Sequence, residues 1–592
     1  ENATTGSQNI IISQGSGANI TIPAGDTKAV YSDGAGSGAA FFDAFASLNV
    51  GVLTATSLDI SGDIDVDGTT NLDVVDIDGA VDMASTLQVD GAITGSSTIN
   101  GVGIISNITN FANGILISQD GSTGTLNAAS NNTGLGNGVF DDLTTGDGNV
   151  GMGYSALSAL TTGSDNVGIG VGALALNTTA VENTLVGSSA GDAISTGSYN
   201  TGFGSATLGA TTTATFNTAV GRHALTANTT GSSNVAVGGQ ALDANTTADN
   251  NTAVGTSSLG ANTTGASNTA VGQGSLAANT TADGNTGVGY QALTANTIGD
   301  RNTALGWSAM ATNVDGDRNV AIGYGAMQTF EPSNTATYNT AVGYVAGNAM
   351  TTAINNTFIG GLANAIGVPG NQNTAVGSQA MYNNADVENT GIGYAALNAN
   401  TSGGYNTAVG SNVMSANTTG DSNVAVGQNA LDANTTASNN VAIGAAALGA
   451  NTTGTNNVMV GNSAGDAITT SNNNTGVGHD VLGANTSGDT NTAMGSTTLN
   501  TNTTGSGNTG VGYAALTANT SGASNVAVGS SALQANTTAA DNVAVGYQAL
   551  LTNTTGAENT SVGSFSMNLN TTGSYNSAFG RLALRVNTTG IQ

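Results

Sequence analysis

The sequence lacks most of the residues from which catalytic and cofactor sites are built. It contains no cysteine, three prolines, two histidines and one tryptophan, and 7% of its 592 residues are charged, whereas a typical soluble domain has about 25%. The missing cysteines exclude disulfides and thiolate metal sites, and they leave the redox compartment undetermined. No apolar run reaches the roughly 18 residues of a membrane helix, so membrane insertion is not expected.

Basic residues are scarce as well. Six lysines and arginines face 36 acidic residues, which gives a formal net charge of −30. Without a basic stripe to neutralise phosphates, the chain is not expected to bind nucleic acid, and anionic membrane surfaces are equally poor partners. The chain begins at Glu1 without a signal-peptide pattern. We therefore expect a processed product or a fragment of a longer gene product.

What the sequence has in abundance is a 17-residue repeat, of which "NVAVGGQALDANTTADN" at 234–250 is typical. When each copy is counted from its first asparagine, 27 copies occupy residues 132–592. The spacing changes twice, by a three-residue insertion (319 to 339) and a one-residue deletion (373 to 389). A period this short and strict predicts an all-β, elongated β-solenoid, or β-roll, in which each copy is one coil.

Two positions of the repeat never change: position 1 is asparagine and position 5 is glycine in every copy. Stacked asparagines can hydrogen-bond their amides along a column, and glycine suits a turn that needs positive φ. Both positions are therefore interpreted as architecture rather than as a functional site.

Positions 2 to 4 predict one short strand per coil, in which positions 2 and 4 share one face and position 3 lies on the other. Position 4 is always apolar, position 3 is usually alanine or glycine, and position 9 is normally leucine, methionine or phenylalanine. Three copies carry a large residue at position 3 and lose the large residue at position 9: Leu185 with Gly191, Phe358 with Asn364, and Met459 with Gly465. Because packed interiors conserve volume, positions 3 and 9 are predicted to point inward and position 4 outward.

The outward column at position 4 predicts self-association. A stripe of 27 apolar side chains far exceeds the patches that monomers tolerate. The simplest cover is the same stripe on sister chains, so the sequence predicts a parallel homotrimer.

The rest of the coil is predicted to be a turn. In two copies with glycine at position 9, position 12 changes from asparagine to Ile194 or Ile468. Residues three apart are neighbours on a helical turn. The segment after the glycine is therefore expected to be either a plain turn or a short helical turn.

The first 131 residues differ from the repeats. Residues 1–48 alternate short β-rich runs with glycine and proline, and they predict a small β domain. Residues 49–105 alternate aspartates with apolar residues and predict an acidic β-helical shaft segment. Residues 106–131 are interpreted as a junction with the solenoid of 132–592.

Only weak candidates for chemistry exist. "DIDVDG" places Asp63, Asp65 and Asp67 at the spacing that begins a calcium loop, but Val74 stands where the loop needs its glutamate, and a strand is the preferred interpretation. His223 and His479 lie in different copies without a nearby nucleophile and are assigned to the surface. The sequence therefore predicts no catalytic residues, no cofactor and no enzyme.

Two further patterns are interpreted structurally. "NTT" recurs in most copies and formally matches a glycosylation acceptor, but asparagine and threonine also favour turns. Seven tyrosines could stack on sugars, but packing at coil corners is preferred. They all follow the position-5 glycine: Tyr154, Tyr290, Tyr324, Tyr344, Tyr394, Tyr513 and Tyr547.

The chain resembles the tail-fibre proteins of marine bacteriophages. "GSGANITIPAGDTKAVYSDGAGSGAA" followed by "SGDIDVDGTTNLDVVDIDGAVDMASTLQVDGAI" looks like their N-terminal half, and arrays of "NTAVGxxALxANTTGxxN" look like their shafts. The array is more distantly similar to the head repeats of trimeric autotransporter adhesins, whose coils are shorter.

The resemblance implies an extracellular, homotrimeric virion fibre. Such a fibre joins other tail proteins on its N-terminal side and reaches a host receptor, either a glycan or an outer-membrane component. The alternative is a bacterial surface adhesin or extracellular filament protein. A glycan-degrading tailspike is disfavoured because it needs paired carboxylates facing one cleft, whereas the acids of the repeats, such as Asp192, Asp243 and Asp466, stand mostly alone.

Overall fold

The computed structural model describes two compact units, Glu1–Gly91 and Ala92–Gln592. In the first it describes residue 3 and residues 5–13, 16, 18–25, 28–32 and 41–43. In the second it describes residues 97–99, 102–108, 110–118, 125–332 and 336–591. Strands and turns form these residues, and helices are absent from them. The predicted acidic segment at 49–105, with Asp63, Asp65 and Asp67, falls almost entirely outside the described residues.

The first unit contains two antiparallel pairs of short strands. β1 (Ile10–Ile12) pairs with β2 (Ile20–Ile22), and β3 (Val30–Ser32) pairs with β4 (Phe41–Asp43). These pairs agree with the β-rich interpretation of this region.

The second unit begins with a hairpin that starts the solenoid. β5 (Ser97–Ile99), β6 (Val102–Ile108) and β7 (Phe111–Ser118) are antiparallel neighbours. β7 then pairs in parallel with β8 (Ala129–Ser130) and with β9 (Thr133–Leu135), the first strand of the repeats. Phe111 and Leu116 are fully buried against the first coils.

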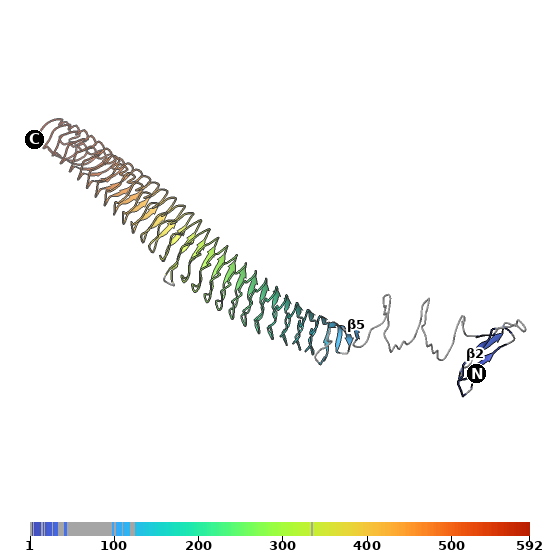
Figure 1. The fold of residues 1–592 in the computed structure, drawn as a ribbon. Coiled ribbons are helices and arrows are strands. Elements are labelled where there is room, and N and C mark those ends of the chain that lie inside the picture. The colour runs from blue at the N-terminus through green and yellow to red at the C-terminus, as the bar shows by residue number, and fades with distance from the viewer. Residues whose placement is uncertain are drawn as a thin grey trace. The chain divides into compact units, whose positions relative to one another are not determined.

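From β9 onward, each of the 27 copies contributes one three-residue strand formed by positions 2 to 4 (Figure 1). The strands after β9 are β10 (Val150–Met152), β11 (Val167–Ile169), β12 (Thr184–Val186), β13 (Thr201–Phe203), β14 (Thr218–Val220), β15 (Val235–Val237), β16 (Thr252–Val254), β17 (Thr269–Val271), β18 (Thr286–Val288), β19 (Thr303–Leu305), β20 (Val320–Ile322), β21 (Thr340–Val342), β22 (Thr357–Ile359), β23 (Thr374–Val376), β24 (Thr390–Ile392), β25 (Thr407–Val409), β26 (Val424–Val426), β27 (Val441–Ile443), β28 (Val458–Val460), β29 (Thr475–Val477), β30 (Thr492–Met494), β31 (Thr509–Val511), β32 (Val526–Val528), β33 (Val543–Val545), β34 (Thr560–Val562) and β35 (Ser577–Phe579).

The strands form one parallel ladder in constant register. Val235 pairs with Thr252, Ala236 with Ala253 and Val237 with Val254. The register persists across the insertion, where β20 pairs with β21, and across the deletion, where β23 pairs with β24. The changes in spacing are therefore absorbed in the turns. Stacking at about 4.8 Å per coil makes the repeat region a rod of roughly 130 Å.

The remainder of each coil is made of turns rather than of a helical turn. In the coil that starts at Asn234, the Ala241 N–H bonds to the Gly238 carbonyl and the Asn245 N–H to the Leu242 carbonyl, three residues back in each case. Positive φ recurs at position 7 (Gln240, 58°) and position 9 (Leu242, 52°). A right-handed helical turn needs negative φ at every residue. The helical-turn alternative was therefore wrong, and the plain turn is confirmed.

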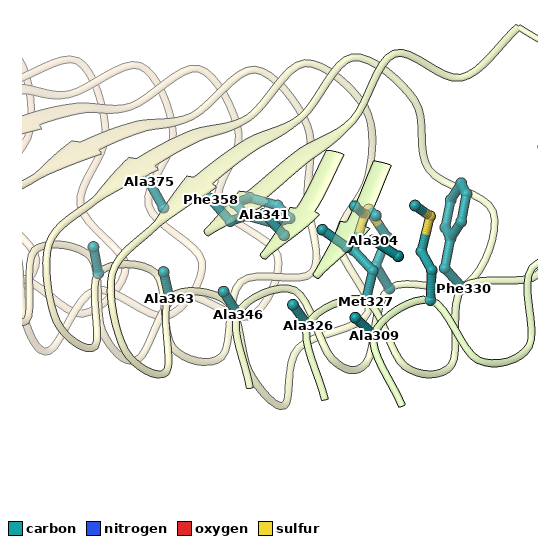
Figure 2. Packing of buried hydrophobic residues seen from close by; sticks show 14 of the residues in the cluster. Ala304, Ala309, Ala326, Met327, Phe330, Ala341, Ala346, Phe358, Ala363 and Ala375 are labelled. Carbon is teal, nitrogen blue, oxygen red and sulfur yellow. The ribbon is translucent and has the colours of Figure 1, made fainter. Parts of the chain in front are cut away.

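The interior of the coil is filled from both of its walls. Positions 1, 3, 8, 9, 12 and 15 are the buried positions of a regular coil. Figure 2 shows position-3 residues such as Ala341 and Phe358 pointing toward the position-8 residues Ala346 and Ala363 on the opposite wall. Position 4 is half-buried or exposed throughout. The predicted inward and outward assignments are therefore confirmed.

The exchange of volume between positions 3 and 9 is also confirmed. A Cβ atom at Gly191 would lie 3.0 Å from Cγ of Leu185, and one at Gly465 would lie 3.1 Å from Cγ of Met459. Phe358 reaches into the preceding coil as well, because a Cβ at Gly347, position 9 of that coil, would lie 3.0 Å from its ring. Leu185 and Met459 instead approach the following coil, where a Cβ at Gly202 would lie 2.4 Å from Leu185 and one at Gly476 2.5 Å from Met459. A large residue at position 3 thus needs space in a neighbouring coil as well as in its own.

The asparagines of position 1 form an uninterrupted buried ladder. The backbone N–H of Asn251 donates to Oδ1 of Asn234 at 2.9 Å, and the equivalent bond links every successive pair from Asn132 to Asn576, including the pairs at the insertion and the deletion. The side-chain N–H of Asn234 also donates to the Ala248 carbonyl of the same coil at 2.8 Å. Each asparagine therefore links two successive coils and also connects the beginning of its own coil to position 15 of that coil.

The position-5 glycine has two reasons to be invariant. Its φ is +139° at Gly238, a region that side chains rarely adopt. A Cβ atom there would also lie 2.5 Å from the carbonyl oxygen of Gly255 in the next coil. The sequence predicted the positive φ at this position. The structure adds a second requirement for glycine, which is the close approach of successive coils.

Candidate functional site

The outward face of the strand ladder is a candidate for binding. It carries threonine, valine or, once, serine (Ser577) at position 2 and the apolar column at position 4. In the single chain, Leu305 and Met494 of that column are each 45% exposed. The column follows the ladder from β9 to β35 without a charged residue. Water therefore contacts a continuous apolar stripe along the described part of the solenoid.

Beside this stripe, position 6 carries aromatic rings in four successive coils. Tyr290, Trp307, Tyr324 and Tyr344 follow the position-5 glycines of their coils and are 43%, 53%, 45% and 59% exposed. The ring centroids of Tyr290 and Trp307 lie 5.8 Å apart, those of Trp307 and Tyr324 5.1 Å, and those of Tyr324 and Tyr344 5.5 Å. We call these four residues the aromatic column.

The aromatic column differs from the scattered corner packing predicted for the tyrosines, because its rings contact one another in successive coils. Tyr154, Tyr394, Tyr513 and Tyr547 are also about half exposed or more, at 61%, 54%, 64% and 48%. Because position 6 points away from the interior, none of these rings contributes to the core. The repeat numbering could have shown that four rings are adjacent, but Trp307 was missed because only tyrosines were compared.

A second group of side chains lies at position 17 of the same coils. The guanidinium of Arg318 lies 5.5 Å from the ring centroid of Tyr338, a cation–π contact. Its Nη1 is also 3.8 Å from Oδ2 of Asp317. Arg301 stands at the same position one coil earlier and is exposed. Two of the six basic residues therefore lie in adjacent coils, next to the insertion.

Two other aromatic pairs occur on the described surface. Tyr199 and Phe216, both at position 17, stack with centroids 4.8 Å apart and an interplanar angle of 4°. Tyr547 and Phe565 meet edge to face at 5.2 Å. Each pair spans only two coils, so neither extends along the rod as the aromatic column does.

The acids at position 16 have a structural role. Oδ1 of Asp300 accepts the Asp283 N–H of the previous coil at 2.8 Å, and Oδ1 of Asp317 accepts the Asp300 N–H at 2.8 Å. Ser164 and Ser232 use their hydroxyl oxygens in the same way. An oxygen at position 16 thus satisfies a backbone donor of the neighbouring coil. These carboxylates are spaced one per coil along the rod, which is not the geometry of an acid–base pair across a cleft.

Four acids at position 10 are perturbed by their surroundings. Desolvation by burial raises the pKa of Asp192, Asp243, Asp432 and Asp466 above the ordinary value. In each case the next coil has glycine at position 10: Gly209, Gly260, Gly449 and Gly483. A Cβ atom at Gly260 would lie 3.4 Å from Oδ1 of Asp243. The glycine thus leaves room for the carboxylate, and the four sites lie in separate parts of the rod.

The two histidines do not form a site together. His223 is half-buried at position 7, with Nδ1 3.4 Å from Oγ1 of Thr226. His479 is exposed at position 6. Their coils are about 70 Å apart at about 4.8 Å per coil. Within the described residues no group of three or more His, Asp or Glu could hold a metal ion, and no helix there is long and apolar enough to cross a membrane.

The "NTT" stretch has a role that the sequence did not reveal. Its asparagine, position 12, forms a second buried ladder in which Nδ2 of Asn245 donates to Oδ1 of Asn228 at 2.9 Å. The first threonine, Thr246, donates its hydroxyl to the Thr263 carbonyl of the next coil at 3.0 Å. The asparagines of these stretches are fully buried up to Asn570, so the folded solenoid does not present them for glycosylation. Asn587, in the last coil, is half-buried.

Comparison with models of known protein families and with curated protein sequences gave no match.

Proposed function

We propose that the chain is the shaft of a homotrimeric phage tail fibre, a structural and attachment protein of the virion. The observation that carries the proposal is the continuous apolar column at position 4, half-exposed in a single chain along the ladder from β9 to β35. Each coil presents the same residue class at the same place. Parallel copies of the chain can therefore cover one another's columns in register over the whole rod.

Small gains per coil add up along such an interface. Covering about 20 Å² of apolar surface contributes roughly 0.5 kcal/mol at about 25 cal/mol per Å². Over the 27 coils of a chain this amounts to roughly 13 kcal/mol, or about 40 kcal/mol for three chains. Forming a trimer takes two associations, each of which costs roughly 4–15 kcal/mol, so the gain exceeds the cost. A closed trimer leaves no apolar column open for further growth.

Stiffness would follow from the ladders already described. The strand ladder and the position-1 asparagine ladder link every coil to the next, so bending the rod would break buried hydrogen bonds. A rod of this kind would hold a binding surface away from the particle, joined to other tail proteins on its N-terminal side. Attachment to the host would come from many weak contacts summed over three chains.

The first test is the native mass of the full chain in solution, measured by light scattering after size exclusion. A trimer at micromolar concentration supports the proposal. A matched variant with charges on the column, Val237→Lys and Val254→Lys, should shift the mass toward the monomer, whereas Thr247→Lys and Thr264→Lys on exposed position 14 should not.

The second test concerns location. Antibodies against the repeats, imaged by electron microscopy on purified particles, should label tail fibres and block attachment to host cells. A stable monomer with its position-4 column in water would contradict the trimer. Labelling of bacterial surfaces instead of particles would contradict the virion assignment and favour the surface adhesin.

A further inference from the structure

The aromatic column is a local feature rather than part of the repeating architecture. Position 6 of the flanking coils is Gln273 before it and Gly361 after it. The interface proposed for position 4 needs an apolar residue in every coil, and position 4 has one. Position 6 carries aromatic rings in successive coils only from Tyr290 to Tyr344, whereas its other four rings stand singly. The column therefore has a beginning and an end, as a local site does.

The rings of the column are held in place by one another. The plane of Trp307 is 82° from that of Tyr290 and 89° from that of Tyr324, so it meets both neighbours edge to face. Tyr324 and Tyr344 are stacked, with an interplanar angle of 17°. Such contacts restrict the rotamers of exposed side chains. The surface is therefore organised before any ligand arrives, which lowers the entropic cost of binding.

The spacing of the column points to one class of ligand. One ring per coil, with centroids 5.1 to 5.8 Å apart along the rod, is close to the length of one pyranose unit in an extended glycan chain. Aromatic rings pack against the C–H faces of sugars, and the tyrosine hydroxyls can donate to and accept from sugar hydroxyls. Three of the four residues carry such a hydroxyl.

We infer that Tyr290, Trp307, Tyr324 and Tyr344 form a binding site for an extended pyranose polysaccharide lying parallel to the rod. The inference names a ligand class for the attachment role, and it rests on the proposed function for the source of that glycan, the host surface. An anionic membrane is a poor occupant because the chain carries a net charge of −30. A second copy of the chain is a poor occupant because the column is confined to four coils.

The column provides its own reporter, because Trp307 is the only tryptophan of the chain. The full chain is titrated with cellohexaose, chitohexaose, maltohexaose and an oligogalacturonate of similar length, and with polysaccharide purified from host cells. A saturable change in tryptophan emission is expected with at least one of these probes. The neutral and acidic probes distinguish whether the chain selects a charged sugar.

Variants locate the site. Trp307→Ala and Tyr324→Ala, followed by retardation in native gels containing the polysaccharide that binds, should weaken binding about tenfold each, the effect of losing roughly 1.4 kcal/mol. Tyr513→Ala is the matched control, because Tyr513 stands at the same repeat position, is 64% exposed and has no ring in the adjacent coils. It should bind like the unmodified chain. Unchanged thermal unfolding verifies that each variant folds.

The possible failures can be told apart. Absence of any emission change and of any gel retardation, or binding by Trp307→Ala equal to that of the unmodified chain, overturns the glycan site, even if the chain is trimeric and attaches to cells. Conversely, a chain that binds polysaccharide through the column but is monomeric and missing from virions keeps the site and overturns the proposed function.

Discussion

Two groups of coils share the same strand ladder but differ in their interior residues. The first runs from Asn217 to Gly284 and the second from Asn319 to Glu388. The first group is regular, with small residues at position 3, leucine at position 9 and asparagine at position 12. The second contains the insertion, the deletion, and Phe330, Gly347 and Phe358 at interior positions. Yet the strand register and the position-1 asparagine ladder are the same in both.

The difference separates two kinds of constraint. Positions 1 and 5 mediate contacts between the backbones of successive coils, and nothing else in the coil can replace them. Positions 3 and 9 fill volume and can exchange it with each other. Position 12 joins this exchange where an apolar residue such as Ile194 or Phe330 replaces the asparagine of the second ladder. Substitutions at the first pair should therefore be costly everywhere, whereas substitutions at the other positions should be compensated by their neighbours.

The largest effect is expected at position 5. Gly238→Ala forces a Cβ atom to 2.5 Å from the carbonyl oxygen of Gly255 at a φ of +139°. It should destabilise the coil by about 3 kcal/mol, measured as faster hydrogen exchange of the amides of that coil and its neighbours. Gly239→Ala is the control, because the nearest heavy atom to its Cβ is 4.0 Å away. Equal exchange in the two variants would refute the close-approach argument.

A second test restores a regular interior in an irregular coil. Leu185→Ala alone leaves a cavity and Gly191→Leu alone overpacks against Leu185 and Ile194, so each should cost about 2–4 kcal/mol. The triple variant with Ile194→Asn has the residues of a regular coil and should recover most of the loss. Thermal unfolding of the singles and the triple measures this coupling. Strictly additive losses would show that the three positions do not share one space.

Next in size is the asparagine ladder. Asn234→Ala removes the acceptor of the Asn251 N–H and the donor to the Ala248 carbonyl. Since both groups are buried, the loss should be about 2 kcal/mol, seen as hydrogen exchange at Asn251. Thr247→Ala, on the exposed side of the same coil, should change stability by less than about 0.5 kcal/mol. If the two variants behave alike, the ladder contributes no measurable stability.

The smallest effect is expected for the acids at position 10. Burial raises the pKa of Asp243 above its ordinary value of 3.8, and hydrogen bonds from the backbone N–H groups of Asp243 and Ala244, with an electrostatic contribution from His223, partly offset this. Because the pKa is higher in the folded than in the unfolded state, the protonated carboxyl contributes folding stability. That contribution is fully present below the pKa of the unfolded state and is lost as the pH rises through the pKa of the folded state. Asp243→Asn should therefore stabilise the rod at pH 7 and leave it unchanged at pH 3.

The gain should stay below about 0.5 kcal/mol, because the carboxylate is partly exposed and screened by solvent. Asp432→Asn should give a similar gain, since burial is also the main cause of the raised pKa of Asp432. Melting temperatures at the two pH values test both. A gain that persists at pH 3 would point to packing rather than to charge.

Much of the solenoid could be predicted from the residues. The 17-residue period predicted one coil per copy, and the apolar pattern at positions 2 to 4 predicted one strand per coil. The pairing of a large residue at position 3 with a small one at position 9, as in Leu185 and Gly191, predicted which positions face the interior. The position-12 ladder could not be distinguished from a turn, because asparagine followed by threonine favours both. The aromatic column could have been found from the repeat numbering, because its four residues share position 6. Finding it required tyrosine and tryptophan to be compared together across the copies.

The sequence by itself determined which residues repeat and which face of the strand is apolar. The reason is that a fixed period places equivalent residues of successive coils next to one another along the rod. Only the tertiary structure decided that leucines such as Leu242 take positive φ. A residue's intrinsic preference is against that conformation, at a cost of about 1 kcal/mol or more. Hydrogen bonds between successive coils and burial of the leucine side chain offset this cost, and both exist only once the coils are stacked.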